Sequence, residues 1–391
     1  MKDLNVIVIG AGIGGLAAAL ALSRAGQHVA VYEQAPELGE VGAGLMITPN
    51  AARALKNLGV YDTVERLALK PGATRYRHYQ SGDELSAMRF TDAFADRYGS
   101  PFLTIHRADL LFALAEGVEA IDPAIIHLGH TLVDCGERDG QVWARFANGV
   151  EATGDALIGA DGVRSTVRSK LHGVTPVRFS GHVAFRGTVP ADRVSRVHHT
   201  SDTFVWVGEG KHVVHYAIKQ GALINYVVIV EREGWTDEGW NLPADKADVL
   251  GEFAGWHPEF TELLEHSDPT GLIKWGLFGR DPLENWRKGR ITLLGDAAHP
   301  TTPFMAQGAA MGLEDAVILA RALAEAGSVE EGLQIYGNTR AGRTTWIPQQ
   351  SLFFGQLFHN LASQDRILKE RLDANEVLYP FDPVTEPLAA F

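Results

Sequence analysis

Two aspartates each follow a short apolar run that has the length and composition of a buried strand. Residues 291–294 (ITLL) lead into Gly295-Asp296, and residues 156–159 (ALIG) lead into Asp161-Gly162. A helix is predicted to begin near Gly308, so its free N–H groups would face the same space as Asp296. Such an arrangement can hold an anion or the polar edge of a ring. Each aspartate alone is equally well explained by an ordinary turn.

A glycine-rich turn near the N-terminus has the pattern of a dinucleotide site. Residues 5–9 are predicted to form a strand, residues 10–15 (GAGIGG) a turn, residues 16–25 a helix, and residues 28–32 a second strand that ends at Glu33. Gly10 would make the turn, Gly12 would let a pyrophosphate approach the backbone, and Gly15 would let the helix pack on the strand. Glu33 would accept hydrogen bonds from ribose hydroxyls. The pattern does not distinguish NAD from FAD, and a glycine-tolerant turn is the alternative.

Three further side chains have types and positions that suit a ligand. His212 and Tyr216 share one face of the predicted strand 211–218, roughly 13 Å apart along it. An aromatic patch packed on a sheet explains them equally well. Arg107 is predicted to begin a helix, where a cation is unfavourable unless it meets an anion such as a phosphate. A solvated surface arginine is the alternative.

Composition limits the class of protein. A chain of 391 residues that is 46% hydrophobic can bury a large core and is predicted to form two domains. Its net charge of −13, without a basic run, argues against nucleic acid or an anionic membrane as a partner. A single cysteine, Cys135, excludes an internal disulfide, and we predict no metal site. No apolar stretch reaches the roughly 18 residues of a membrane span, so we expect a soluble, cytoplasmic protein.

The predicted elements interleave two domains of a mixed α/β (α+β) fold. A Rossmann-like nucleotide-binding domain takes residues 1–75, 101–177 and 275–338. A β-rich domain is inserted between its parts and takes residues 76–100 and 178–274, where apolar and polar residues alternate. Residues 339–391 form a C-terminal segment that begins as a helix.

The order of three motifs resembles a known family. Gly10–Gly15 with Glu33, then Asp161-Gly162, then Gly295-Asp296 is the order found in single-component FAD-dependent aromatic hydroxylases, the class A flavoprotein monooxygenases. Shorter matches resemble the branch that contains salicylate, 3-hydroxybenzoate and 6-hydroxynicotinate hydroxylases. These matches are residues 104–107 (TIHR), 273–275 (IKW), 282–283 (PL), Trp286, 295–300 (GDAAHP), 305–308 (MAQG) and 378–382 (LYPFD).

The resemblance implies FAD as the bound cofactor, with NAD(P)H as a transient co-substrate. It places Gly10, Gly12 and Gly15 at the pyrophosphate and Glu33 at the adenosine ribose. Arg107 would meet the phosphate or ribityl region, and Asp296 the ribityl chain. Asp161 and Gly162 would serve both FAD and the nicotinamide nucleotide. The loop from Gly42 to Asn50 would lie beside a flavin that swings between two positions.

The activity implied by the resemblance is hydroxylation of a hydroxylated aromatic or heteroaromatic carboxylate with NAD(P)H and O₂, through a flavin C4a-hydroperoxide. An NAD-linked dehydrogenase, or another flavin reductase or oxidase of the same fold, is the alternative. A small aromatic molecule and O₂ are the expected partners, and the protein would be a monomer or homodimer.

The resemblance also implies a substrate pocket. His212 and Tyr216 would orient and deprotonate the ring hydroxyl, since a phenolate attacks more readily than a phenol. His299 and Pro300 would line the pocket, and Arg186 would meet the carboxylate. Met46 and Phe304 stand where 6-hydroxynicotinate hydroxylases carry histidines. These two apolar residues argue against 6-hydroxynicotinate itself as the substrate.

Overall fold

One half of the molecule is built on a six-stranded sheet. The computed structural model describes residues 1, 3–39, 43–174, 176–235 and 242–390. The strand order is β18-β19-β11-β1-β2-β7, and the pairs are parallel except for β18 with β19. The strands are β18 (Arg287–Lys288), β19 (Ile291–Leu293), β11 (Ala156–Gly159), β1 (Asn5–Ile9), β2 (His28–Tyr32) and β7 (Ile126–His127). The central strands are buried on both faces, which explains their continuous apolar runs.

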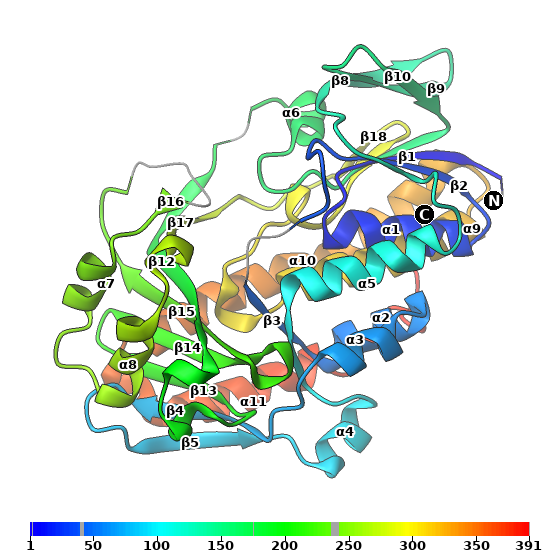
Figure 1. The fold of residues 1–391 in the computed structure, drawn as a ribbon. Helices are drawn as coiled ribbons and strands as arrows, with labels where there is room; N and C mark the ends of the chain where they lie inside the picture. Colours follow the sequence, from blue (N-terminus) through cyan, green and yellow to red (C-terminus); the bar gives the residue numbers. More distant parts are fainter. Residues whose placement is uncertain (2, 40–42, 175, 236–241, 391) are drawn as a thin grey trace.

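Helices cover this sheet and complete the predicted βαβ unit (Figure 1). In that unit α1 packs between α5 and α9, and α2 packs on α9. The helices of this half are α1 (Ile13–Arg24), α2 (Pro49–Leu58), α3 (Tyr61–Leu67), α5 (Arg107–Glu119), α6 (Thr166–His172) and α9 (Gly308–Glu325). Nine residues of α1 are buried, so its alanines and leucines belong to the core of this half. The predicted Rossmann-like arrangement is confirmed.

The second half is built on an eight-stranded sheet of order β16-β17-β12-β15-β14-β13-β4-β5. Its strands are β16 (Leu242–Pro243), β17 (Ile273–Gly279), β12 (Arg178–Pro190), β15 (Leu223–Glu231), β14 (Lys211–Ile218), β13 (Thr203–Gly208), β4 (Ala73–His78) and β5 (Glu84–Arg89). All pairs are antiparallel except β13 with β4. Residues near 76–100 thus join a sheet made mainly by residues 178–279.

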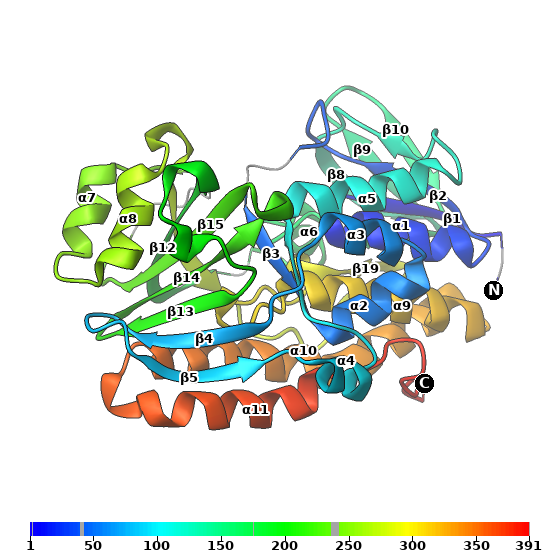
Figure 2. The same cartoon turned by 60° about the horizontal axis from the view of Figure 1, so that its bottom comes forward.

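The two faces of this sheet belong to two different cores. Val213 and Ala217 of β14 pack with Phe253 and Phe260, on the side covered by α7 (Lys246–Glu252) and α8 (Pro258–His266). The opposite face, with Ile229 of β15, packs against α10 (Val329–Phe358) and α11 (Ile367–Leu378). Figure 2 shows α11 running alongside β4 and β5, with α7 and α8 on the far side of the sheet. Alternation along each strand therefore decides which side chains face the C-terminal helices.

Smaller elements link the two halves. The sheet β8 (Leu132–Arg138), β9 (Gln141–Phe146) and β10 (Glu151–Gly154) is an antiparallel meander. The pair β3 (Gly44–Ile47) and β6 (Leu103–His106) lies between the halves, and α4 (Asp92–Tyr98) follows β5. Short 3₁₀ turns used below are η5 (Gly295–Ala297), η6 (Pro303–Met305) and η7 (Leu361–Arg366).

The predicted domain boundaries do not coincide with element ends everywhere. The boundary at residue 75 falls inside β4, and the boundary at residue 338 falls inside α10, which continues to Phe358 through an internal Pro348. The division into two interleaved domains with these limits stays a prediction. Within the described residues, no helix combines the length and apolar character that a membrane crossing requires.

Candidate active site

Three cavities follow one another through the interior and share walls. A cavity of about 490 Å³ is lined by Glu33, Asp161 and Arg164, and a second of about 330 Å³ by Arg107 and Asp296. These two share Gly12, Ala160 and Gly162. A third, of about 170 Å³, shares Leu45, Met46, Pro303 and Ala306 with the second. The series runs from the six-stranded sheet to the eight-stranded sheet.

The glycine turn leaves room for a long ligand at Gly12. A Cβ at Gly12 would meet no protein atom within 4 Å, although Gly12 lines both larger cavities. At Gly10, whose φ is +103°, a Cβ would lie 2.5 Å from the carbonyl oxygen of Ala160. At Gly15 it would lie 1.9 Å from the carbonyl oxygen of Gly10. Gly10 and Gly15 are therefore required by the fold, whereas Gly12 leaves the space that a pyrophosphate needs.

Two acidic residues at the ends of β2 and β11 hold their own loops. The carboxylate of Glu33 accepts hydrogen bonds from the backbone N–H groups of Ala11 (2.8 Å) and Ala35 (2.9 Å). The carboxylate of Asp161 accepts from the Ser165 hydroxyl (2.5 Å) and from the N–H groups of Thr166 (2.7 Å) and Val167. Burial raises the pKa of Asp161, an effect that these hydrogen bonds oppose. Glu33 and Asp161 border the first cavity, and Asp161 also binds the first two N–H groups of α6, whose N-cap is Ser165.

Asp296 and Arg107 face the second cavity together. Asp296 follows β19 on the turn η5, where Gly295 takes a φ of +62°, and its side chain is open to the cavity although it lies deep in the molecule. Burial raises the pKa of Asp296, while His299 and Arg107 act in the opposite direction. The N-terminus of α9, at Gly308 and Ala309, borders the same cavity. An acidic acceptor, a cation and free N–H groups suit the polar chain and phosphates of a dinucleotide.

Ala306 holds a backbone conformation that alanine rarely adopts. Its φ of +56° and ψ of +38° place it in the left-handed region, directly before the helix α9 and in the wall between the second and third cavities. Such a conformation is unfavourable by about 1–2 kcal/mol for an L-residue with a Cβ. Strained backbone of this kind is concentrated at functional sites, and no residue pattern in the sequence marks it here.

His299 and Pro300 do not line the third cavity, contrary to expectation. The Nε2 atom of His299 lies 2.6 Å from the carboxylate of Asp315 on α9, which also accepts from the Gly295 N–H (3.0 Å) and from Arg340 Nε (2.7 Å). Burial alone would raise the pKa of Asp315, but His299 and Arg340 hold it at about 2. His299 therefore connects the Gly295-Asp296 turn to α9, and the next residue, Pro300, is also buried.

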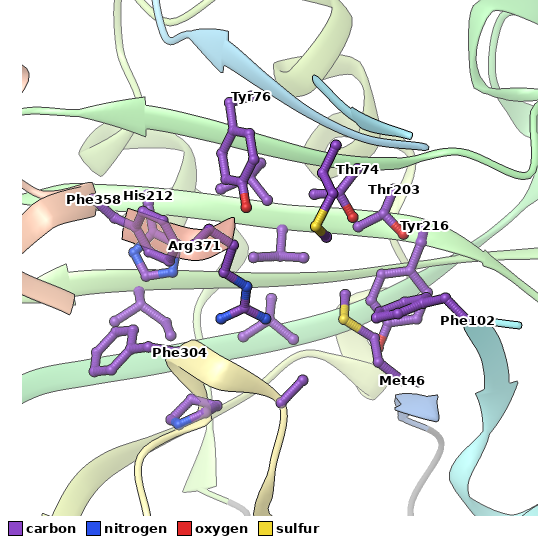
Figure 3. Close-up of a pocket in the computed structure, with 18 of the residues that line it drawn as sticks. Met46, Thr74, Tyr76, Phe102, Thr203, His212, Tyr216, Phe304, Phe358 and Arg371 are labelled. Atoms are coloured by element: carbon purple, nitrogen blue, oxygen red, sulfur yellow. The ribbon is translucent and has the colours of Figure 1, made fainter. Parts of the chain in front are cut away.

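The third cavity is small and mostly apolar. Met46 of β3 and Phe304 of η6 line it, as do His212 and Tyr216 of β14 (Figure 3). A cavity of about 150 Å³ is large enough to bind benzene. The volume of about 170 Å³ therefore suits one substituted aromatic ring. Gly42, part of the loop predicted to border the flavin, lies outside the described residues.

Tyr216 is placed by close contact between β14 and β3. A Cβ at Gly44 would lie 2.7 Å from the Tyr216 hydroxyl, so only glycine lets β3 approach so closely. The Gly44 N–H donates to the side-chain oxygen of Asn225 (2.8 Å) on the neighbouring strand β15. Burial raises the pKa of Tyr216, so its phenol keeps its proton and acts as a hydrogen-bond donor. Deprotonation of a substrate by Tyr216 is therefore not favoured.

His212 begins a hydrogen-bonded chain that leads to the surface. Its Nδ1 lies 2.7 Å from Nε2 of His359, and Nδ1 of His359 lies 3.0 Å from the carboxylate of Glu231. The side chain of Glu231 is 53% exposed, whereas both histidines are buried. Burial lowers the pKa of His212 far below its usual value and that of His359 to about 3, so both rings are neutral. His359 follows α10 and was not singled out from the sequence.

The arginine that lines the third cavity is not the predicted one. Arg186, predicted to meet a carboxylate, lies on β12 with its guanidinium 5.3 Å from the ring centre of Trp275, and it does not line the third cavity. Arg371 of α11 does line it. The buried residues of α11 are Ile367, Arg371, Ala374, Asn375 and Leu378, a helical stripe that includes the arginine. That spacing is the signal by which Arg371 was recognisable in the sequence.

The chain matches the family described as FAD binding domain over residues 3–351. Among characterised proteins, 3-amino-4-hydroxybenzoate 2-monooxygenase PtmB3 of Streptomyces platensis is 36% identical and covers 97% of this chain and 96% of its own length. The 3-hydroxybenzoate 6-hydroxylase 1 of Aquipseudomonas alcaligenes is 34% identical, with 91% and 90% covered. The 6-hydroxynicotinate 3-monooxygenase of Pseudomonas fluorescens is 36% identical, with 89% and 90% covered.

Solved structures agree over the whole chain. Klebsiella pneumoniae HpxO in complex with FAD and uric acid has a TM-score of 0.83 at 26% identity, covering 98% of this chain and 96% of its own. A salicylate hydroxylase in complex with its substrate has a TM-score of 0.80 at 27% identity, with both chains covered completely. The fold, including the helical C-terminal segment, is therefore shared with proteins that bind FAD.

Proposed function

The chain belongs to the FAD-dependent aromatic hydroxylases, and from this premise we propose that it hydroxylates a hydroxylated aromatic or heteroaromatic carboxylate. The main observation that supports this proposal is the wall shared by the second and third cavities. This wall is formed by Leu45, Met46, Pro303 and Ala306. A single ring in the third cavity would lie directly beside the cofactor. The named relatives act on aromatic acids with a hydroxyl group, which supports the same class of substrate here.

The residues around the two larger cavities are proposed to hold FAD. Gly10, Gly12 and Gly15 shape the turn that receives the pyrophosphate, with Glu33 and Asp161 bordering the adenosine end. Asp296, Arg107 and the N-terminus of α9 surround the space for the ribityl chain and ring. Bound FAD supplies the redox chemistry, which consumes NAD(P)H and O₂ and transfers one oxygen atom to the substrate.

His212 is proposed as the group that accepts the proton of the ring hydroxyl. Its Nδ1 is engaged with His359, so Nε2 is the nitrogen left for a ligand in the cavity. A carboxylate only accepts hydrogen bonds, so we assign the proton between His359 and Glu231 to His359 Nδ1. His359 Nε2 then accepts from His212 Nδ1–H, which leaves His212 Nε2 with a free lone pair.

Proton transfer along this chain leaves neither imidazole charged, while the substrate becomes a phenolate and Glu231 takes up the proton. The ring hydroxyl gives its proton to His212 Nε2, His212 Nδ1–H passes to His359 Nε2, and His359 Nδ1–H passes to Glu231. Each imidazole ends neutral, in agreement with the lowered pKa values of both rings. Tyr216, as a donor, would orient the ring rather than ionise it.

The test is substrate-stimulated consumption of NAD(P)H by the purified protein. We expect a yellow protein whose NAD(P)H oxidation rises with 3-hydroxybenzoate, salicylate, 6-hydroxynicotinate or 3-amino-4-hydroxybenzoate, and whose product is one oxygen atom heavier. Oxidation that all four acids leave unchanged, or that yields only hydrogen peroxide, would indicate a flavin reductase or oxidase instead. Family membership removes the alternative of an NAD-linked dehydrogenase.

A further inference from the structure

Arg371 brings a buried cation to the third cavity. It lies in the middle of α11, is only 6% exposed, and lines the cavity together with Tyr76 and Phe304. Figure 3 shows its guanidinium group pointing in among the other side chains, with His212 to one side and Tyr216 to the other. The C-terminal helix thus supplies the one guanidinium among the described residues that line this cavity.

The structure gives this cation no counterion. Nη2 of Arg371 donates to the carbonyl oxygen of Met305 (3.3 Å), and the guanidinium lies 5.4 Å from the ring centre of Phe354. Nε and Nη1 are buried and form no hydrogen bond of ordinary geometry in the described part of the chain. The Tyr379 hydroxyl is a neutral hydrogen-bonding neighbour of Arg371 and supplies no counterion. Among the same residues, no carboxylate lies within 4.0 Å of Arg371. Two tyrosines, Tyr76 and Tyr379, are near enough for its charge to lower their pKa values against the effect of burial.

Arg340 is a buried arginine whose charge is neutralised within the fold. Arg340 is fully buried, and it contacts the carboxylates of Glu314 (2.8 Å) and Asp315 (2.7 Å). A guanidinium does not lose its proton in proteins, so burial cannot neutralise Arg371. A buried charge without a partner is strongly unfavourable, and ordinarily another charged group offsets it. For Arg371 the described residues supply no such group, and an anionic ligand would supply it.

We propose that Arg371 is the anion anchor of the pocket, binding the carboxylate of the aromatic substrate through its guanidinium group. The proposal deepens the proposed function and rests on it. Guanidinium and carboxylate groups match as a pair of parallel hydrogen bonds, and the apolar surroundings strengthen that pairing. It replaces Arg186, whose guanidinium is occupied at Trp275 outside the cavity.

Such an anchor would decide both selectivity and orientation. An uncharged ring would leave Arg371 unpaired, so the pocket would reject an amide or a simple phenol in favour of the acid. With its carboxylate held by α11, the ring would present its other edges to His212 and Tyr216 on β14. The C-terminal segment would then be part of the substrate site and not only a cover over the sheet.

The experiment compares an acid with its uncharged amide. The dissociation constants of 3-hydroxybenzoate and 3-hydroxybenzamide are measured on the FAD-bound protein through the change in flavin absorbance, which requires no turnover. For Arg371→Met we expect the acid to bind about 10- to 100-fold more weakly while the amide changes by less than about 3-fold. Arg371→Lys keeps the charge and should retain part of the preference for the acid. Arg366→Met, which removes an exposed arginine from the preceding turn η7, is the matched control and should bind both as the wild type does.

Two results would overturn the proposal. Equal binding of the acid by Arg371→Met and wild type, at normal FAD content and melting temperature, would show that no anion pairs with Arg371. Equal weakening of acid and amide, accompanied by loss of FAD or a lowered melting temperature, would show that Arg371 only clamps the loop at Met305. If the wild type prefers the acid through Arg371 yet hydroxylates none of the four acids, the proposed function fails and the anchor stands.

Discussion

At the scale of single residues, burial makes His212 a proton acceptor and Tyr216 a hydrogen-bond donor. Both lie on the same face of β14, as the alternation of the strand predicts. Burial disfavours the charged form of each, so the phenol keeps its proton and the imidazole stays unprotonated. A neutral imidazole accepts a proton and a neutral phenol donates a hydrogen bond. The sequence predicted that the pair faces a ligand but not this division of work.

Tyr216→Phe should uncouple the reaction. Without the donor hydroxyl the ring is still bound, so flavin reduction by NAD(P)H should continue, whereas oxygen transfer to a misoriented ring should slow by about 10²- to 10⁴-fold. The surplus NAD(P)H should appear as hydrogen peroxide. Stopped-flow kinetics measures flavin reduction, and the yield of hydroxylated product per NAD(P)H consumed measures oxygen transfer. Unchanged coupling in Tyr216→Phe and His212→Ala together would leave this pair as aromatic packing on a sheet.

His359→Gln should slow hydroxylation most at neutral pH. The substitution interrupts the path from His212 to Glu231, so the proton of the ring hydroxyl has no exit until the hydroxyl ionises in solution, near pH 10 for a phenol. We expect a loss of about 10-fold or more at pH 7 that narrows towards pH 9. His182→Gln is the control, because His182 packs against the ring of His359 (5.1 Å) without belonging to the chain. A pH-independent defect would argue for a packing role of His359.

Arg371 and His359 show why the residue-scale prediction was incomplete. The sequence of α11, with Lys369, Glu370 and Asp373 around Arg371, has the composition of a solvent-exposed helix. Only the 3.6-residue spacing of its buried side chains separates Arg371 from its neighbours. His359 stands at the end of a helix, where no motif marks it. His359 contacts His212, 147 residues away along the chain, and Arg371 donates to Met305, 66 residues away. Local patterns do not encode such contacts.

At the scale of elements, strands and turns were the most predictable features. The strands β1, β2 and β14 have the predicted limits, because each is a short β-branched run between turn residues. The functional turn around Ala306 was not predicted as strained, since its conformation is imposed by η6 and α9 on either side. The 30 residues of α10 were also not foreseen, since an internal proline ordinarily ends a helix.

The glycine turn allows folding and cofactor binding to be separated. Gly12 has a φ of −72° and open space around the position of a Cβ, so Gly12→Ala should keep the melting temperature of the FAD-free protein while weakening FAD binding. Gly15→Ala should lower that melting temperature itself, because its Cβ would collide with the backbone of Gly10. Thermal unfolding without FAD and fluorescence titration with FAD distinguish the two. Equal effects of both variants on folding would contradict the assignment of Gly12 to the cofactor.

At the scale of the whole molecule, the third cavity exists only because distant segments close around it. β3 comes from the first 50 residues, β14 from the eight-stranded sheet, η6 from the turn before α9, and α11 from the C-terminus. The sequence predicted the two sheets and the cofactor turn, since each follows from local periodicity and motifs. The packing of α10 and α11 on the eight-stranded sheet could not be predicted from the sequence, because those contacts depend on how the two halves of the molecule pack together.

Buried neutral histidines should make the whole molecule lose stability in mild acid. His215, on the face of β14 opposite to His212, accepts a hydrogen bond from Trp206 Nε1 (2.9 Å) and stacks on Phe204. Burial lowers its pKa far below 6.5, with smaller effects of His198 and Arg77 in the same direction. Below about pH 6.5 the His215 imidazole therefore binds a proton in the unfolded chain but not in the folded chain. The free energy of unfolding consequently falls as the pH decreases from 6.5. Asp315 affects stability over a lower pH range. Its contribution to the free energy of unfolding is lost only below about pH 4, as the pH falls towards its pKa of about 2.

The substitution His215→Gln removes one of these buried imidazoles and so tests its contribution to the pH dependence of stability. We expect the variant to be less stable than the wild type at pH 7.5, since it loses the stacking on Phe204, and the difference to shrink by about 1.4 kcal/mol for each pH unit below 6.5. Urea unfolding between pH 5 and 7.5 with excess FAD measures this slope, and the exposed His28→Gln should show none. Parallel curves for His215→Gln and the wild type would mean that His215 takes up its proton in the folded protein, which its stacking against Phe204 and its acceptor role towards Trp206 both oppose.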